Sequence, residues 1–127
     1  MTCGCAQIQR LSGLWYSAEY STFSISDEAG KYQLSVSGYS GDAGDAFAGH
    51  TTDDRYNNDG MMFTTPDSDN DACPCNCAEE RNNGWWYHYC SVSALNFDVG
   101  NFDGNGIWQI SSVVHEVQAS RMLVMYN

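Results

Sequence analysis

Six cysteines constrain this chain of 127 residues more than any other feature. They form a Cys-x-Cys pair at positions 3 and 5, a Cys-x-Cys-x-Cys run at 73–77, and a single Cys90. An even number at this density is typical of an oxidising compartment, where cysteines form disulfides. Structural zinc sites usually separate paired ligands by two to four residues, so the one-residue spacing favours disulfides over zinc. The sequence therefore predicts a secreted, extracellular protein braced by disulfides.

Charge and composition narrow the class of protein further. The chain has 16 acidic and 5 basic residues, a formal net charge of −11, and 43% hydrophobic residues. That hydrophobic share supports a single folded domain over residues 1–127. So few cations could not neutralise a run of phosphates, which excludes nucleic-acid binding and disfavours anionic membranes. Because no run of about 18 apolar residues occurs, we expect no membrane insertion.

Short aromatic and β-branched segments predict strands, and helix signals are scarce. The expected elements, in chain order, are a hairpin at 15–25 and 32–39, one helical turn at 41–47, an aromatic strand or corner at 85–87, and strands at 107–110 and 122–126, the last closing the sheet at the C-terminus. Polar, Gly-rich and Asn-rich stretches between them predict loops. The pattern indicates a loop-rich α+β fold around a small antiparallel sheet with little helix.

Alternate carboxylates occur in an irregular polar segment at Asp67, Asp69 and Asp71. Ca²⁺ takes several oxygen ligands in loose geometry, so this spacing favours a calcium loop, with a bare acidic turn as the alternative. An EF-hand is excluded, because Ala72 and Ala78 stand where that motif needs Gly and Glu. The sequence predicts a calcium loop of another kind.

No group of residues has the spacing of a catalytic site. The stretch at 38–41 (GYSG) approaches a nucleophile elbow, but Asp42 stands where that motif needs glycine. The three histidines share no ligand spacing. Other acidic residues, such as Asp53, Asp54 and Asp59, are interpreted as a solvated face. We therefore expect no catalytic residues and no enzyme activity.

Four motifs occur together in an order that resembles a known family. They are Tyr32–Phe47 (YQLSVSGYSGDAGDAF), Asp67–Asp71 (DSDND), Asn76–Glu79 (NCAE) and Gly84–Cys90 (GWWYHYC). Their order and spacing resemble those of fibrinogen-related domains, which include the C-terminal globes of fibrinogen, ficolins, tachylectins and angiopoietins. The resemblance runs from about Trp15 to Tyr126 and leaves residues 1–14 unmatched. It implies a fibrinogen C-terminal-like fold.

The resemblance also implies a calcium site beside a ligand pocket. Counting back from Cys77, the family's calcium ligands fall on the side chains of Asp69 and Asp71, with Asp67 as a further candidate, and on the backbone carbonyls of Cys73 and Cys75. The implied ligand-binding residues are Asn76, Cys77, Ala78, Trp86, Tyr87, Tyr89, Ser91 and Asp103. For Trp86 and its neighbour Trp85, core packing is the competing interpretation. The family often has a cis peptide at this point, here Asn76–Cys77. A non-proline cis bond costs about 3–4 kcal/mol, so we expect it only if calcium and the disulfide hold it.

The disulfide pattern follows in part from the same resemblance. Cys77 and Cys90 match a family disulfide around the aromatic motif. The other four cysteines are not family positions: Cys3, Cys5, Cys73 and Cys75. Pairing inside a Cys-x-Cys would close a very small ring, so we expect each N-terminal cysteine to meet one in the 73–75 pair. Such bridges would clamp the N-terminus beside the calcium loop or, between chains, build a covalent polymer.

Departures from the family pattern bear on the ligand. Ser91 stands where His is common, and Arg81 stands where fibrinogen's peptide-binding hole has an acid. The loop between Leu95 and Gly106 is short, and the family's N-terminal subdomain has no counterpart. These differences disfavour binding of a fibrin-type peptide and weaken the case for acetylated sugars.

Two functions follow from the sequence. One is an extracellular, calcium-binding recognition module, lectin-like, for a carbohydrate or glycoprotein. The other is a structural subunit, stabilised by disulfides and calcium, that assembles with copies of itself into an extracellular fibre or matrix.

Overall fold

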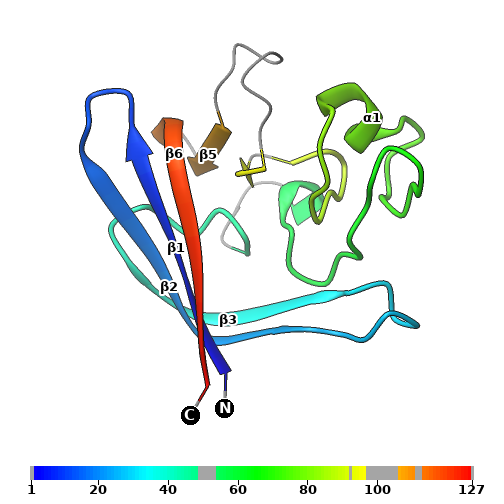
Figure 1. Cartoon of the computed structure of the whole chain (residues 1–127), viewed down its shortest axis with the longest axis horizontal. Coiled ribbons are helices and arrows are strands. Elements are labelled where there is room, and N and C mark those ends of the chain that lie inside the picture. Colours follow the sequence, from blue (N-terminus) through cyan, green and yellow to red (C-terminus); the bar gives the residue numbers. More distant parts are fainter. Residues whose placement is uncertain (1, 49–53, 92, 97–105, 111–112, 127) are drawn as a thin grey trace.

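The structure is a computed structural model that describes residues 2–48, 54–91, 93–96, 106–110 and 113–126. Its elements, in chain order, are β1 (Thr2–Arg10), β2 (Trp15–Ile25), β3 (Leu34–Gly41), a 3-10 helix (Asp54–Tyr56), α1 (Cys77–Arg81), β4 (Ser93–Ala94), β5 (Gly106–Ile110) and β6 (Val113–Tyr126). A curved sheet lies on one side and the loops that carry α1 on the other (Figure 1). This arrangement confirms the predicted fold class. No helix among the described residues is long and apolar enough to cross a membrane.

Six strands form one sheet in the order β3-β2-β1-β6-β5-β4, and every neighbouring pair is antiparallel. The predicted hairpin is confirmed as β2 and β3, which pair from Ala18↔Gly41 to Ile25↔Leu34. The last strand differs from the prediction. β6 begins earlier than expected and lies between β1 and β5, so it does not close the sheet at an edge.

The central strand β1 lies in the segment that the sequence motifs left unmatched. Its side chains alternate: Ala6 and Ile8 are buried in the core, whereas Cys3 and Cys5 lie on the opposite, half-exposed face. Gly4 belongs to the inward set, and a Cβ at that position would lie 2.7 Å from the Phe23 ring. A glycine is therefore required for close packing of the hairpin against β1.

An aromatic core fills the space between the sheet and the loops. Phe47 is fully buried, and its ring centroid lies 5.4 Å from Tyr20, 5.9 Å from Trp85 and 5.0 Å from Trp108. The Trp108 indole N–H also donates to the carbonyl of Gly44 at 2.9 Å. Buried aromatic rings remove large apolar areas from water, so this cluster joins the hairpin, the loops and β5 into one core.

Gly41 ends β3, and residues 42–47 form bends and a turn in place of the helical turn predicted at 41–47. The backbone N–H groups of Asp42 and Ala43 both donate to the carbonyl of Ser17, at 3.0 and 2.9 Å. The Asp42 carboxylate in turn accepts from the Ser17 N–H at 2.7 Å. These bonds draw the segment back onto β2, so its donors are no longer available for a helical turn.

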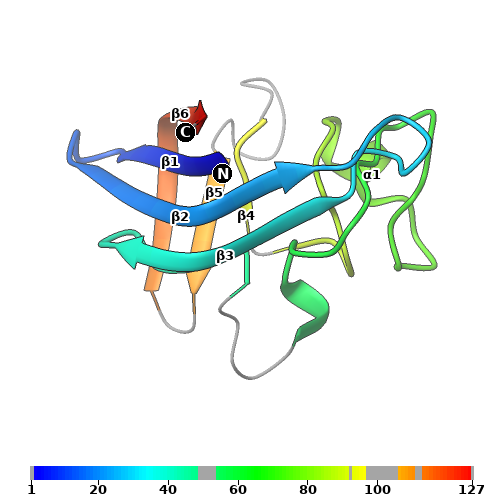
Figure 2. The same cartoon turned by 90° about the horizontal axis from the view of Figure 1, so that it is seen from below.

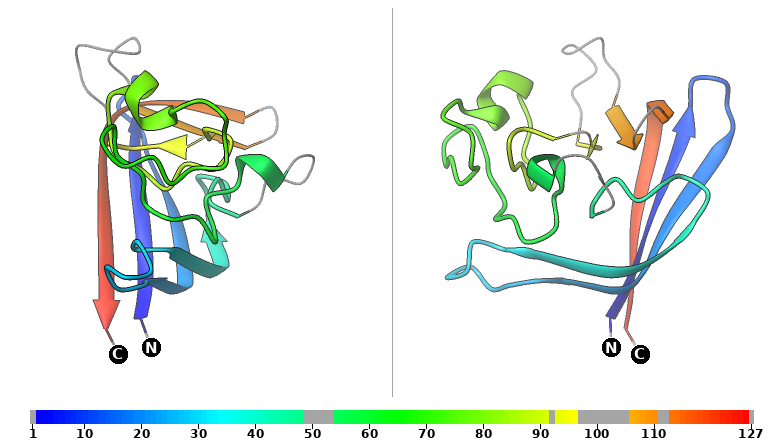
Figure 3. Two further views of the ribbon diagram at one scale, coloured as in Figure 1. Left: turned by 90° about the vertical axis from the view of Figure 1, so that its right-hand side faces the viewer. Right: turned by 180° about the vertical axis from the view of Figure 1, so that it is seen from behind.

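Along the hairpin, the side chains that face the core alternate with those that face solvent, and this alternation shifts by one residue near Gly38. Tyr20 pairs with Tyr39, and three residues further along β2 the buried Phe23 pairs with Val36. Gly38, with φ +72, lies between these pairs. Beyond it the hairpin continues under the loops, as Figures 2 and 3 show. A strict alternation therefore fails here, and both Phe23 and Tyr20 reach the core.

Candidate functional site

The loop after Pro66 turns the carboxylates of Asp69 and Asp71 onto its own backbone. Asp71 Oδ1 accepts from the backbone N–H of Cys73, and its Oδ2 accepts from the N–H of Cys77, both at 3.0 Å. Asp69 Oδ1 accepts from the N–H of Asp71 at 3.2 Å. One carboxylate therefore joins both ends of the 73–77 segment, and a second lies beside it.

Electrostatics make the Asp69–Asp71 pair unfavourable when both are charged. Burial is the main reason that the pKa of the Asp71 carboxyl lies above its usual range, and the neighbouring Asp69 raises it further. The N–H bonds from Cys77 and Cys73 oppose this rise without cancelling it. Two carboxylates in this arrangement are stabilised by a bound proton or a cation.

The donor chemistry of this loop fits Ca²⁺, which prefers carboxylate and carbonyl oxygens. The side chains of Asp69 and Asp71 and the backbone carbonyls of Cys73 and Cys75 would hold the ion. Asp67 lies in the preceding turn, where the Thr65 hydroxyl donates to its Oδ1 at 2.7 Å. Its role as a calcium ligand stays a prediction.

Asn70 anchors the loop between the two acidic residues. The Lys31 ammonium, at the tip of the hairpin, donates to Asn70 Oδ1 at 3.1 Å. The Asn70 amide donates to the carbonyl of Phe63 at 3.0 Å, and its backbone N–H donates to Thr64 Oγ1 at 2.9 Å. The loop is thus attached to the hairpin through a residue that the calcium motif does not itself use.

Helix α1 begins directly after the loop and was absent from the predicted elements. Asn76 Oδ1 accepts from the backbone N–H of Glu79 at 3.1 Å, and the Asn76 amide donates back to the Glu79 carboxylate at 3.4 Å. Asn76 is therefore the N-cap of α1, and the Glu79 carboxylate bonds to its side-chain amide. Asn followed three residues later by Glu is a helix-start signal that could have predicted the helix. The structure has no cis peptide bond in its described part, so the expected cis bond at Asn76–Cys77 is wrong. An extended Asn76, with φ −105 and ψ 96, already directs the Cys77 N–H toward Asp71 through a trans bond.

Cys77 and Cys90 form the disulfide that the family resemblance implied, with a Cα–Cα distance of 5.2 Å. Cys90 has φ +51, in the left-handed region, which costs an L-residue about 1–2 kcal/mol. Its carbonyl accepts from the His88 N–H at 2.9 Å. The disulfide and this tight turn together place the aromatic segment beside the acidic loop that carries Asp69 and Asp71.

The remaining cysteines depart from the prediction. Cys73 and Cys75 bond to each other with a Cα–Cα distance of 5.0 Å, and Cys3 and Cys5 remain free thiols. The chain bends through residues 71–75, which brings these Cα atoms into the range that a disulfide needs, about 4.4–6.8 Å. The expected bridges between the N-terminus and the 73–75 pair do not form. The N-terminus is held by the sheet instead.

Most of the residues assigned to a ligand pocket have buried side chains: Cys77, Ala78, Trp86, Tyr87 and Ser91. The Trp86 indole donates to the carbonyl of Tyr32 at 2.9 Å, and the Tyr87 hydroxyl donates to Asn83. Burial raises the pKa of Tyr87 to about 12. These aromatic side chains pack in the core, in agreement with the competing interpretation for Trp86.

Two of the assigned residues offer surface to a ligand. Asn76 is half-buried, and Tyr89 is exposed with the Arg55 guanidinium 5.5 Å from its ring centroid. A ligand role for these two stays a prediction. Asp103 lies outside the described residues.

Asn58 is a buried polar residue that the sequence patterns do not mark. Its amide nitrogen donates to the carbonyl of Trp86 and to Ser91 Oγ, both at 2.8 Å. Its oxygen accepts from the Ser93 hydroxyl at 2.6 Å. The Asn-Asn-Asp-Gly run around it has no periodicity, so nothing in the sequence indicates that Asn58 supports the aromatic corner from within.

A sheet joined by an aromatic core to a disulfide-braced acidic loop is the arrangement of fibrinogen-like globes. The chain superposes on the fibrinogen-like globe domain of human ANGPTL2 with a TM-score of 0.79 at 28% identity, covering 98% of this chain and 57% of that one. It superposes on a lamprey fibrin D-dimer, complexed with the peptide Gly-His-Arg-Pro-amide, with a TM-score of 0.83 at 27% identity, covering 97% of this chain and 44% of that one.

Sequence comparison gives the same assignment. The chain belongs to the family of C-terminal globular domains of the fibrinogen beta and gamma chains, whose model matches residues 5–124. The match begins before Trp15, so it includes most of β1. The mouse fibrinogen gamma chain is 34% identical over 116 residues, which are 86% of this chain and 26% of that protein. Bovine angiopoietin-4 is 42% identical over 82 residues, which are 62% of this chain and 14% of that protein.

Proposed function

We propose that this chain is a calcium-stabilised recognition module of a secreted, extracellular protein, and that it has no enzymatic activity. Membership of the fibrinogen family supports a binding role. One observation carries the proposal: the Asp71 carboxylate joins the N–H groups of Cys73 and Cys77, with Asp69 beside it. A cation bound there would act directly on the start of α1 and on the disulfide corner.

In this proposal, calcium holds the segment at 73–77 in one conformation. Its positive charge offsets the repulsion between the Asp69 and Asp71 carboxylates and lowers the pKa of Asp71, which favours the ionised form of that carboxyl. Asp71 then keeps its two charge-assisted hydrogen bonds to the backbone, which are stronger than neutral ones. The segment that carries Asn76 is thereby held in place before any ligand arrives, which reduces the ordering cost of binding.

The ligand that we propose is an acetylated sugar or a glycoprotein glycan at the surface of Asn76 and Tyr89. Tyr89 presents an exposed ring, with the Arg55 guanidinium 5.5 Å from its centroid. A peptide with a cationic end fits less well, because the Arg81 guanidinium lies 5.8 Å from the Tyr87 ring centroid where an acid would be needed.

Thermal unfolding in CaCl₂ and in EDTA tests the calcium site. Binding at a ligand concentration of 100 times Kd stabilises the folded state by about 2.7 kcal/mol. For 127 residues, at about 2.1 cal/mol/K of unfolding entropy per residue, this raises Tm by roughly 10 °C. Asp69→Asn should lose the response, and Glu28→Gln, an exposed acid in the hairpin turn, should keep it. Equal Tm values for the parent protein in CaCl₂ and EDTA would contradict the calcium assignment.

Calorimetric titration with N-acetylglucosamine, with and without CaCl₂, tests the ligand separately. We expect heat of binding only with calcium, and its loss in Tyr89→Ala. Binding that is the same in Tyr89→Ala would place the ligand elsewhere, without affecting the calcium result.

A further inference from the structure

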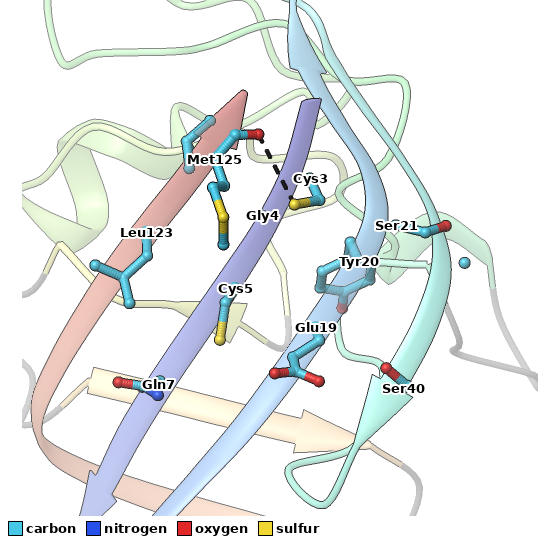
Figure 4. Close-up of a pocket in the computed structure, with 12 residues that line it drawn as sticks. Cys3, Gly4, Cys5, Gln7, Glu19, Tyr20, Ser21, Ser40, Leu123 and Met125 are labelled. Carbon is cyan, nitrogen blue, oxygen red and sulfur yellow. Dashed lines mark hydrogen bonds between the residues drawn. The ribbon is translucent and has the colours of Figure 1, made fainter. Parts of the chain in front are cut away.

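The outer face of the sheet, turned away from the core, carries an apolar groove with two free thiols. Cys3 pairs with Met125 and Cys5 pairs with Leu123 across β1 and β6, so these four side chains form two rows on one face. Figure 4 shows them together, and the groove between them has a volume of about 590 Å³. Leu123 is 51% exposed and Met125 is 64% exposed.

This combination differs from an ordinary solvent-facing side of an antiparallel sheet, which is mostly polar. The floor of the groove toward β3 consists of the small residues Ser21, Gly38 and Ser40. Small residues there leave room for side chains from another surface. Methionine, aromatic residues and arginine are enriched at protein interfaces, and Trp15, 46% exposed with the Arg121 guanidinium 5.0 Å from its ring centroid, extends the same face.

The two thiols cannot reach each other while β1 remains a strand. Residues i and i+2 of a strand project in parallel, about 6.6 Å apart, whereas the Cβ atoms of a disulfide lie about 4 Å apart. The other four cysteines are already paired. Cys3 and Cys5 are half-exposed, so a partner thiol must come from outside the chain.

The charges on this face allow a second copy of the same chain to bind there. The net charge of the chain is −11, so most surfaces of a second copy would repel it. The charged groups that act on Cys5 are one of each sign, Glu19 and Arg121. The patch is therefore close to neutral, and an arginine from one copy can meet a glutamate from the other.

We propose that the outer face of β6, β1 and β2 docks a second copy of this chain, with Cys3 and Cys5 bonding to the same residues of that copy. Both cysteines lie on one line along β1. A two-fold axis parallel to β1 brings each of these cysteines to the same cysteine of the second copy. The same rotation sets β6 of one copy against β2 of the other, so that Arg121 of the first copy lies near Glu19 of the second. These residues lie apart from the calcium loop, so the inference is independent of the proposed function.

The bridges form by thiol–disulfide exchange with a small disulfide such as oxidised glutathione. A cysteine thiolate attacks the glutathione disulfide and releases one glutathione thiol. The thiol of the second copy then displaces the other glutathione, also as a thiol. Each bridge therefore consumes two protein thiols and one glutathione disulfide, and yields one protein disulfide and two glutathione thiols.

The test follows the molecular mass of the full chain in a glutathione redox buffer containing EDTA, so that calcium binding has no influence. We expect light scattering to show twice the monomer mass of 14.1 kDa, and peptide mapping without reduction to find Cys5 bonded to Cys5, and Cys3 to Cys3. Leu123→Glu should slow dimer formation at least tenfold, and so should Met125→Glu. Leu11→Glu is the matched control, because Leu11 is also 51% exposed but lies in the β1–β2 turn.

Three results would overturn the proposal. The first is a monomer whose thiols are free or capped by glutathione. The second is a Cys3–Cys5 bond within one chain. The third is equal rates of dimer formation in Leu123→Glu, Met125→Glu and Leu11→Glu, since random oxidation needs no docking. Circular dichroism of each variant, compared with the parent, identifies a variant that fails to fold, and the other glutamate variant then decides the result.

Discussion

Replacing Asn58 with alanine should weaken the aromatic corner more than any exposed polar substitution. The fully buried amide makes three hydrogen bonds that connect the 54–60 loop to Trp86, Ser91 and Ser93. Each contributes about 1 kcal/mol to stability, and a buried carbonyl left without a partner adds a cost of about 1–3 kcal/mol. We therefore expect Asn58→Ala to lower the free energy of unfolding by about 4–6 kcal/mol, before any cavity cost.

Thermal and urea unfolding in CaCl₂ measure this loss. With about 2.1 cal/mol/K of unfolding entropy per residue over 127 residues, the change corresponds to a Tm drop of about 15–22 °C. Asn96→Ala is the control, because Asn96 is exposed and its amide makes one hydrogen bond, to the carbonyl of Gly84 at 3.0 Å. Its cost should not exceed about 1 kcal/mol. If the two variants lose equal stability, the buried network does not support the corner as argued.

Two other substitutions address the calcium loop and the hairpin. Because the pKa of Asp71 is raised in the folded protein, its contribution to stability is present at low pH and lost as pH rises through that pKa. In EDTA, the stability of the parent protein relative to Asp71→Asn should therefore fall as the pH rises above the usual range of an aspartate carboxyl. A difference that does not depend on pH would contradict the assignment. Gly38→Ala should cost more than about 1 kcal/mol, because φ is +72 and the new Cβ would meet Ser21 Oγ at 1.8 Å. Adding Ser21→Ala should recover only part of this loss, because the Cβ of residue 21 would still lie 2.9 Å from the new Cβ and φ stays at +72. Full recovery in urea unfolding would contradict this reasoning.

Motifs predicted the fold well because several of them had to agree at once. The aromatic hairpin, the acidic loop and the Trp-Trp segment each carry rare residues in a fixed order, and the structure places all three around one core. The central strand β1 was missed although Ala6 and Ile8 alternate with Gln7 and Gln9. Cys3 and Cys5 lie on the outer face although cysteine is usually a buried residue, so the alternation of buried and exposed residues is obscured at this end of the strand.

Which cysteines form disulfides and which polar side chains are buried were harder to predict, because both depend on the local shape of the backbone. Cys73 and Cys75 pair because the chain bends around Pro74, whereas the same spacing in the strand at Cys3 and Cys5 keeps two thiols apart. The number of residues between two cysteines therefore does not predict whether they bond. The hydrogen bonds of Asn58 likewise depend on three segments meeting in space, which a pattern within one segment does not encode.

The position of β1 also determines the order in which the sheet can form. The hairpin of β2 and β3 joins residues close in sequence, but the ladder between β1 and β6 runs to Thr2↔Tyr126, across nearly the whole chain (Figure 1). Pairings of such long sequence separation form slowly, because the ends of a long loop must first meet. During synthesis β1 is made early and β6 late, so the edge of β1 that pairs with β6 has no partner until the last strand emerges.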